Sequence, residues 1–523
     1  MSSQMHSITS RLAHARTGAF VALVLTALPA IAQAQQAPDL SALDKYVAKA
    51  ARDWKVPGMA IAVVKDDSLV FAKGYGVLER GKPAPATEHT RFAIGSTTKA
   101  MTVASLAMLV DEGKLKWDDR VIDYFPDFQL YDAYVTRELT VRDLLTHRTG
   151  LPGTDLLWGL SANQYSLPEM MRRLRYVKPI SSFRSHWEYQ NVMYAIAGGL
   201  VAKISGMPWE KFVQTRIFDP LGMKESIPLV TEVIGKPNVA VPHGEVHDTV
   251  RVIPMRTTDA IAPAGSVYSS VSDMSKWMRF ILDSGRVGDK RLIKPATFRE
   301  MIAPEIRAPE SQYPALELAQ PKFFSYALGW FVEEYNGETI WMHTGSIDGM
   351  CAIIALMPSR RVGVYVLENL DHAELRHALI YKVFDMYHPP AKGPARDWSA
   401  DVKALFEARH ASARKAAADV AAKGPRKDVP ASLPLAEYAG TYVDSTYGNF
   451  EITVRDSVLS ARFEKFDIGE LAHTTYDSFR SRKDDPRERV TELTFVPDGT
   501  GHVASLQAFG VTFERTTPRS PPE

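Results

Sequence analysis

The sequence predicts an α+β fold followed by a small all-β domain, which we expect to close into a barrel. Short apolar strands lie near both ends of residues 40–390, and helical patterns fill the stretch between them. An antiparallel sheet assembled from both ends of a domain, with helices inserted between its strands, is typical of the α+β class. From residue 433 onward, short alternating apolar runs separated by turn residues favour a β-barrel.

Two strand pairs and three helical patterns support the first domain. Short apolar runs bounded by turn residues predict that residues 59–64 pair with 69–71, and residues 350–357 with 362–367. A glycine directly after an apolar helical pattern stops a helix. Such a glycine follows each predicted helix, at residues 98–112 before Gly113, 192–204 before Gly206 and 272–282 before Gly285.

Charge and cysteine content exclude two classes of protein. The chain of 523 residues carries 62 Lys and Arg against 61 Asp and Glu, a formal net charge of +1. Nucleic-acid-binding proteins normally carry a basic excess, so we expect no nucleic-acid partner. The single cysteine, Cys351, excludes an intramolecular disulfide framework and a metal site made of several cysteines. We expect no metal and no other cofactor.

Residues 1–34 are predicted to form a signal peptide. Basic residues precede an apolar run at 18–31, and the A-x-A cleavage pattern follows at 32–34. The apolar run is too short to span a membrane comfortably. We therefore expect an exported protein, periplasmic or secreted, that has no membrane contact after signal removal; the oligomeric state stays open. The expected domains are the α+β domain at 40–390, a polar linker helix at 391–430 and the β domain at 431–516.

The first candidate catalytic pair is Ser96 with Lys99. An S-x-x-K pattern at a helix start places the serine and the lysine one turn apart on the same face. A serine hydroxyl needs a base within hydrogen-bonding reach, and a lysine serves where burial lowers its pKa. The helix that follows is apolar on nearly all of its faces, which indicates burial. The alternative role for Ser96 is a surface N-cap, and a second copy of the pattern at Ser412 and Lys415 is expected to have no catalytic role.

Tyr189 and Asn191 form a second candidate group at the start of the helix 192–204. A phenol near a lysine ammonium can be pushed toward phenolate and accept a proton, and an amide two residues on can hydrogen-bond both the lysine and a substrate. A packed aromatic beside a polar cap is the alternative. The Y-x-N pattern also recurs at Tyr447 and Asn449, so it carries little weight alone.

A third candidate group, His343-Thr344-Gly345-Ser346, lies just before the strand 350–357. A Thr-Gly pair at a strand edge allows the backbone to approach a ligand closely. On its own, a His-Thr-Gly sequence is more typical of an ordinary loop.

In this order, the three motifs resemble those of the serine β-lactamase and penicillin-binding protein superfamily. The resemblance covers about residues 40–390 and implies the antiparallel sheet with flanking helices of that fold. Its connecting stretches are similar to the class C branch, which also contains esterases and D-amino-acid-specific peptidases; they lie at 144–151, 189–194, 204–206, 220–223 and 264–273. Residues 438–442 and the strands behind them are similar to the lipocalin-like domains fused to some of these hydrolases.

The resemblance implies a role for each motif residue. Ser96 would be the nucleophile that becomes acylated, and Lys99 and Tyr189 would share the proton transfers. The backbone N–H groups of Ser96 and Ser346 would form the oxyanion hole. The candidates for substrate and oxyanion binding are Asn191, His343, Thr344 and Ser346.

The sequence departs from the family's K-T-G motif where it has His343. In the resembling β-lactamases a lysine at this position attracts the substrate carboxylate, whereas an unperturbed histidine loses its charge above about pH 6.5. H-T-G variants look more like the esterase and peptidase members. We therefore predict a secreted serine hydrolase that forms an acyl-enzyme on Ser96 and cleaves amide or peptide bonds, D-residues included, or esters, in small molecules or short peptides. The alternatives are a β-lactamase and a non-catalytic penicillin-recognising binding protein.

Overall fold

The computed structural model describes residues 38–160, 165–246, 249–390, 396–423, 429–482 and 490–516. The predicted signal peptide, residues 1–34, lies outside the described residues. Within the described ranges, none of the helices has the length and apolar character needed to cross a membrane.

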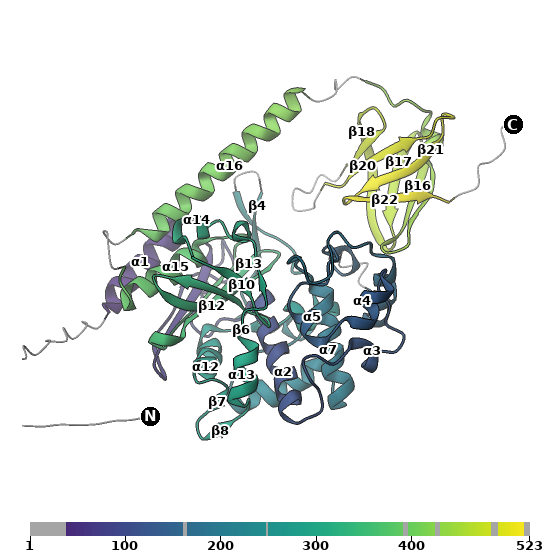
Figure 1. Cartoon of the computed structure of the whole chain (residues 1–523). Helices are drawn as coiled ribbons and strands as arrows, with labels where there is room; N and C mark the ends of the chain where they lie inside the picture. Colours follow the sequence, from purple (N-terminus) through teal and green to yellow (C-terminus); the bar gives the residue numbers. More distant parts are fainter. Residues whose placement is uncertain are drawn as a thin grey trace, which may run out of the picture. The chain divides into compact units, whose positions relative to one another are not determined.

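An eight-stranded antiparallel sheet forms the centre of the first domain (Figure 1). The strands lie in the order β2-β1-β14-β13-β12-β11-β10-β9. The pairing of β1 with β14, in which Met59 lies opposite Glu368, joins the two ends of the domain and confirms the predicted layout. The strand bounds are β1 Gly58–Lys65, β2 Ser68–Gly76, β9 Ile306–Arg307, β10 Phe324–Tyr326, β11 Phe331–Tyr335, β12 Glu338–Ile347, β13 Met350–Met357 and β14 Val362–Glu368.

Both faces of the central strands are buried, which explains their unbroken apolar sequences. In β1, Ala60 and Ala62 pack into one apolar core, whereas Ile61 and Val63 pack into the core on the other face. A strand covered on both faces has no polar alternation. Helices α1 (Leu40–Asp53) and α15 (Leu375–Tyr387) contribute to the second core; α2 (Lys99–Asp111), α7 (Asn191–Ser205) and α12 (Val271–Leu282) contribute to the first.

The three predicted helices are present, with ends within a few residues of those expected. A one-turn 3-10 helix at Gly95–Thr98 precedes α2, and Gly113 follows α2 with φ 72°. Gly206 ends α7 in the left-handed conformation with φ 74°, which glycine adopts without a Cβ clash. The glycine stops in the sequence therefore located these helix ends correctly.

Short elements complete the first domain. The remaining helices are α3 Val121–Tyr124, α4 Ala133–Glu138, α5 Val141–Leu145, α6 Leu167–Arg173, α8 Trp209–Val213, α9 Asp219–Leu221, α10 Val230–Val233, α11 Ala262–Gly265, α13 Pro295–Met301 and α14 Leu316–Ala319. The two-stranded sheets are β3 Phe92–Ala93 with β6 Tyr268–Ser269, β4 His243–Val246 with β5 Thr249–Val252, and β7 Arg286–Val287 with β8 Lys290–Arg291.

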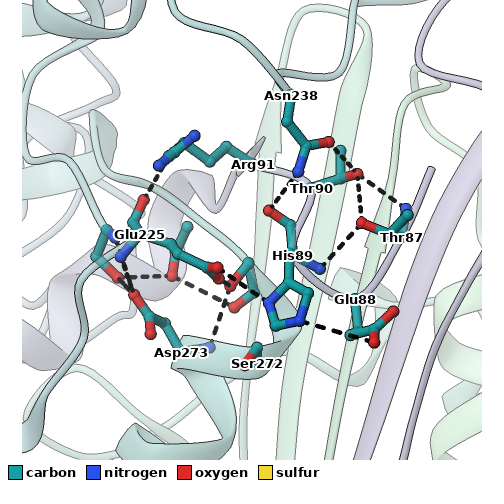
Figure 2. A network of polar contacts seen from close by, with 12 residues as sticks. Thr87, Glu88, His89, Thr90, Arg91, Glu225, Asn238, Ser272 and Asp273 are labelled. Carbon is teal, nitrogen blue, oxygen red and sulfur yellow. Dashed lines mark hydrogen bonds and ion pairs between the residues drawn. The ribbon is translucent and has the colours of Figure 1, made fainter. Parts of the chain in front are cut away.

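A polar network fixes the segment that leads into Gly95–Thr98 (Figure 2). Asp273, in the first turn of α12, accepts hydrogen bonds from the backbone N–H groups of Glu225 at 2.6 Å and Ser226 at 2.9 Å. His89 Nδ1 lies 2.9 Å from the Glu225 carboxylate, and Arg91 Nε donates to the Glu225 carbonyl oxygen at 2.8 Å. The chain therefore enters β3, and the turn that carries Ser96, from an anchored position.

The C-terminal strands form a closed eight-stranded barrel, as the fold class predicted. In β16, Phe450 and Ile452 point into the barrel core, and Glu451 between them is exposed. This alternation is the period-two signal of a strand with one buried face. Helix α16, Trp398–Lys423, precedes the barrel, and α17 is Leu435–Tyr438. The barrel strands are β15 Gly440–Asp444, β16 Gly448–Arg455, β17 Val458–Phe463, β18 Phe466–Thr475, β19 Ser478–Ser481, β20 Glu492–Pro497, β21 Val503–Ala508 and β22 Val511–Arg515.

Candidate active site

Ser96 and Lys99 face each other across one helical turn. The Lys99 Nζ lies 3.0 Å from the Ser96 Oγ. Lys99 is fully buried although it stands at the start of α2. Burial lowers the pKa of the Lys99 amine well below its usual range, and the negative charge of Asp155 opposes that shift only in part. Burial therefore favours the neutral amine, whose lone pair can accept the Ser96 proton.

The other contacts of Lys99 orient that lone pair. Its Nζ donates to Asn191 Oδ1 at 2.8 Å and to the carbonyl oxygen of Ala264 at 2.9 Å. A neutral amine has two N–H donors, and these two acceptors satisfy both of them. The remaining lone pair is left for the hydroxyl of Ser96. Asn191, at the start of α7, thus has the positioning contact with Lys99 that the sequence predicted.

Tyr189 lies against both residues of this pair. The Lys99 Nζ is 4.7 Å from the centroid of the Tyr189 ring. Burial raises the pKa of the Tyr189 phenol well above its usual range, and a hydrogen bond with Ser96 offsets that rise only in part. Tyr189 therefore keeps its proton, and the phenolate expected from the sequence is wrong because the ring is buried beside an amine that burial shifts toward its neutral form. The protonated phenol is suited to donate a proton.

The backbone beside Ser96 is packed so closely that two glycines are required. Gly95 has φ 51°, and a Cβ on it would lie 2.7 Å from the backbone nitrogen of Ser346. A Cβ on Gly345 would overlap the Ile94 carbonyl oxygen and lie 3.0 Å from the backbone nitrogen of Ser96. The two glycines thereby allow the backbone nitrogens of Ser96 and Ser346 to lie close together, as a two-donor oxyanion hole requires.

Beyond Met342, the strand that carries Ser346 is paired on one side only within the described sheet, and Ser346 is the exposed residue of this part. The pairing of β12 with β11 ends where Met342 lies opposite Phe331, while its pairing with β13 continues to Ile347. In the described part of the sheet, residues 343–347 therefore have a strand partner on one side only. An edge of this kind can pair with an extended peptide.

His343 is buried and neutral, unlike the titrating residue expected from the sequence. Its Nδ1 lies 2.6 Å from the Thr344 carbonyl oxygen, so Nδ1 carries the proton; its Nε2, 3.0 Å from the Tyr326 hydroxyl, is then the acceptor. Burial lowers the pKa of His343 to about 3. The unperturbed value near 6.5 does not apply because the ring is buried. His343 therefore offers no cation to a substrate carboxylate at neutral pH.

Thr344 and Ser346 lie on the same strand with different exposure. Thr344 is buried, and its Oγ1 lies 2.7 Å from the Tyr313 hydroxyl. Ser346 is exposed. The Thr344 side chain is thus held by the protein interior, whereas Ser346 remains available to a ligand.

Three residues beside the predicted group were missed by the sequence analysis. His147 is fully buried, with its ring centroid 4.3 Å from that of Tyr189. Arg376, at the start of α15, is also buried and donates to the Gly345 carbonyl oxygen at 2.7 Å and to Ser346 Oγ at 2.9 Å. Arg376 thus supports the strand that carries the predicted oxyanion donor.

The third missed residue, Asp155, is exposed and contacts Asn191. Its Oδ1 accepts from Asn191 Nδ2 at 3.2 Å. Asp155, like Arg376, lies in a part of the chain without a motif, so local sequence carried no signal for it. His147 lies in the connecting stretch 144–151, a loop that the resemblance implies is structural, and for that reason it was not among the candidates.

The described residues contain no group of three or more His, Cys, Asp or Glu side chains that could hold a metal ion. The site itself brings together a buried amine, a hydroxyl, a protonated phenol and two backbone N–H donors. These groups are the ones that acyl transfer through a serine needs: a base, a nucleophile, a proton donor and an oxyanion hole.

Comparisons with known proteins match both parts of the chain. The β-lactamase family model matches residues 43–385, and a model for a domain of unknown function matches residues 424–518. The Unguisins hydrolase of Aspergillus violaceofuscus is 29% identical over 433 residues, which are 79% of this chain and 76% of that protein.

Two solved structures share the fold. The octameric penicillin-binding protein homologue from Pyrococcus abyssi is 21% identical with a TM-score of 0.60, over 91% of this chain and 99% of that one. The class C β-lactamase from Rhodobacter sphaeroides is 22% identical with a TM-score of 0.53, over 66% of this chain and 99% of that one. At these identities the likeness concerns the fold.

Proposed function

The chain belongs to the β-lactamase family of serine hydrolases, and from that premise we propose that it forms an acyl-enzyme on Ser96 and cleaves amide or ester bonds. One observation carries the proposal: the buried Lys99 amine lies 3.0 Å from the Ser96 hydroxyl, with its two other partners both acceptors. A serine in reach of a neutral amine is an activated nucleophile.

In the proposed acylation, Ser96, Lys99 and Tyr189 act one after another. Ser96 Oγ attacks the substrate carbonyl while its proton passes to Lys99. The backbone N–H groups of Ser96 and Ser346 stabilise the negative charge that develops on the carbonyl oxygen. The carbon–nitrogen or carbon–oxygen bond then breaks, and the leaving group takes the Tyr189 proton. Transfer of the extra proton from Lys99 to Tyr189 restores both groups.

Deacylation repeats the same steps with water. Water attacks the Ser96 ester and gives a proton to Lys99. The ester bond breaks, and Ser96 Oγ leaves and takes that proton back. No cofactor takes part in this sequence, and each group ends in its starting state.

Amide or peptide substrates, D-residues included, are the first class that we propose. The relative from Aspergillus violaceofuscus is named as a hydrolase of unguisins. The β12 edge that has no strand partner in the described sheet beyond Met342, and that is exposed at Ser346, supports binding of an extended acyl chain. Esters form the second class, and β-lactams the third because the buried, neutral His343 offers no cation to their carboxylate.

Covalent labelling tests the nucleophile. A fluorophosphonate probe should label the wild type and Ser412→Ala, but should not label Ser96→Ala. A panel of p-nitroanilides, p-nitrophenyl esters and a chromogenic cephalosporin then ranks the substrate classes. Equal labelling of the wild type and Ser96→Ala would contradict the assignment. A wild type that binds fluorescent penicillin reversibly without covalent labelling would favour the non-catalytic binding protein.

We also propose that the protein is exported, periplasmic or secreted, on the strength of the signal-peptide pattern at residues 1–34. Cell fractionation and N-terminal sequencing of the mature protein test this. A product that starts near Gln35 outside the cytoplasm supports export, and an uncleaved cytoplasmic product refutes it.

A further inference from the structure

Asp155 places a carboxylate one amide group away from the catalytic amine. Its Oδ1 accepts from Asn191 Nδ2 at 3.2 Å and from Trp158 Nε1 at 2.9 Å, and Asn191 Oδ1 in turn accepts from Lys99 at 2.8 Å. Among the described residues, no Lys, Arg or His side chain forms an ion pair with Asp155, and its Oδ2 has no hydrogen-bond donor. The side chain is exposed, so a ligand can reach it.

The charged groups described around Asp155 have a negative net charge. Arg256 lies over the Trp158 ring, 5.8 Å from its centroid, but its Nε is 3.0 Å from the carboxylate of Asp348. Asp348 follows Ser346 by two residues in the turn between β12 and β13. The guanidinium is therefore neutralised by Asp348 and not by Asp155. The Lys99 amine, which is linked to Asp155 through Asn191, is shifted by burial toward its neutral form.

The negative charge of Asp155 influences which substrates bind. A negative charge attracts a cationic group on the acyl part of a substrate and repels an anionic one. An ammonium carries three N–H donors, and one of them can donate a charge-assisted hydrogen bond to the free Oδ2. Trp158 and Asn191 hold the Asp155 carboxylate through Oδ1, so the free oxygen is already oriented before a ligand arrives.

We infer that Asp155 is a specificity-determining residue that binds the free ammonium group of an amino-acid or short-peptide acyl donor. This inference rests on the proposed acyl-enzyme function and narrows its substrate class to acyl donors with a positively charged amine. It excludes anionic acyl groups as preferred substrates, because the Asp155 carboxylate would repel them.

Matched substrate pairs test the role of Asp155. Aminoacyl and dipeptidyl p-nitroanilides, of both D and L configuration, are compared with their N-acetyl derivatives, which lack the charge. The measured quantity is the ratio of kcat/KM for the free amine over the N-acetyl form. We expect a ratio above one in the wild type and a fall of about fivefold in Asp155→Asn, the upper end of the effect of one exposed charge pair. Any effect on catalysis itself cancels in the ratio.

A charge-matched control separates the local effect from net charge. Asp289 lies exposed in the turn between β7 and β8, and Asp289→Asn changes the net charge by the same amount. Asp289→Asn should keep the wild-type ratio. Because exposed charge pairs are screened by salt, 1 M NaCl should reduce the wild-type ratio and leave that of Asp155→Asn nearly constant.

The outcomes distinguish this inference from the function on which it rests. If the fluorophosphonate labels Ser96 but the ratio is the same in the wild type and Asp155→Asn, Asp155 does not bind the ammonium and the acyl-enzyme stands. A wild type that prefers the N-acetyl substrates overturns the role of Asp155 in the same way. If Ser96 is neither labelled nor needed for turnover, the proposed function fails, and the role of Asp155 fails with it.

Discussion

The S-x-x-K pattern occurs twice in the chain, and its two copies lie in opposite environments. Lys99 is fully buried and its Nζ lies 3.0 Å from Ser96 Oγ. Ser412 and Lys415 are both exposed on α16. Helix geometry brings serine and lysine to the same face in both copies. What distinguishes the first copy is the removal of water from the amine, which favours the neutral form that can accept a proton.

The two copies of the Y-x-N pattern differ in their contacts. Tyr189 and Asn191 contact the Ser96–Lys99 pair, while Tyr447 and Asn449 belong to the barrel region, where Asn449 is exposed. The first copies of the two patterns thus meet in one site. The second copies lie in different elements, one on α16 and one in the barrel region. A short motif gains its chemistry from the buried surroundings in which the fold places it.

The largest expected effect comes from removing the buried amine. Lys99→Met should lower kcat/KM by about 10³-fold or more, because the general base is lost while a side chain of similar size fills the space. Lys415→Met should keep the wild-type value. Both are measured with the best substrate of the hydrolysis panel, and circular dichroism checks that Lys99→Met is folded. Substantial turnover in a folded Lys99→Met would show that another group takes the Ser96 proton.

The second effect concerns the phenol. Tyr189→Phe should lower kcat by about 10²-fold, since only the proton donor to the leaving group is lost. Substrates with a good leaving group, such as p-nitrophenyl esters, need less protonation and should be affected less than amides. Tyr476→Phe, at an exposed tyrosine of the barrel, is the control and should have wild-type kinetics. A Tyr189→Phe protein with lower thermal stability and unchanged kcat would mean that the hydroxyl serves packing alone.

The third prediction concerns pH. Activity needs neutral Lys99, so kcat/KM should rise with pH along a limb that follows the lowered pKa of this amine and lies well below its usual value near 10.5. The pKa of His343 is about 3, so His343 does not titrate above pH 5. The midpoint of the limb should therefore be the same in the wild type and in His343→Asn. Loss of a limb near pH 6.5 in His343→Asn would show that the histidine is exposed to water.

The sequence correctly predicted those helices and strands that are marked by a pattern of neighbouring residues. The apolar run at 350–357 gave the bounds of β13, and the glycines after α2 and α7 marked where each helix ends. Short edge strands such as β9, with two residues, carry no periodicity and were not predicted. The sequence also placed Ser96, Lys99 and Asn191 in one site, through spacing and resemblance, and the structure brings these three side chains into contact.

What the sequence could not supply is the surroundings that distant segments create. Asp155 reaches Asn191 through a contact between residues 36 positions apart, without any motif around it. The neutral state of His343 depends on burial and on a contact with Tyr326 from another strand. A pKa belongs to the assembled site, so the unperturbed value assumed for His343 was wrong once the ring was enclosed.

The smallest expected effect tests whether burial is what keeps ionisable groups neutral in this protein, and it uses an acidic residue outside the active site. Glu333 in β11 is fully buried, and its Oε1 accepts from the Tyr381 hydroxyl at 3.1 Å. Burial raises the pKa of Glu333 from 4.5 to about 8. The folded state therefore binds this proton more tightly than the unfolded state, and stability should fall as pH rises from about 4.5 to 8. Lys99 and Glu333 thus share one cause, which favours the neutral form of each.

Glu333→Gln should remove that part of the pH dependence, because glutamine does not titrate. Between pH 6 and pH 9 the wild-type Tm should fall by a few degrees more than that of Glu333→Gln, the shift that about 1–2 kcal/mol produces in a domain of this size. Glu338→Gln is the control, since Ser359 and Arg360 lower the pKa of Glu338 and it stays ionised over this whole interval. Its Tm should therefore change with pH as the wild-type Tm does. Equal slopes in all three proteins would mean that water reaches Glu333, and burial alone would then be an insufficient cause for the neutral amine of Lys99.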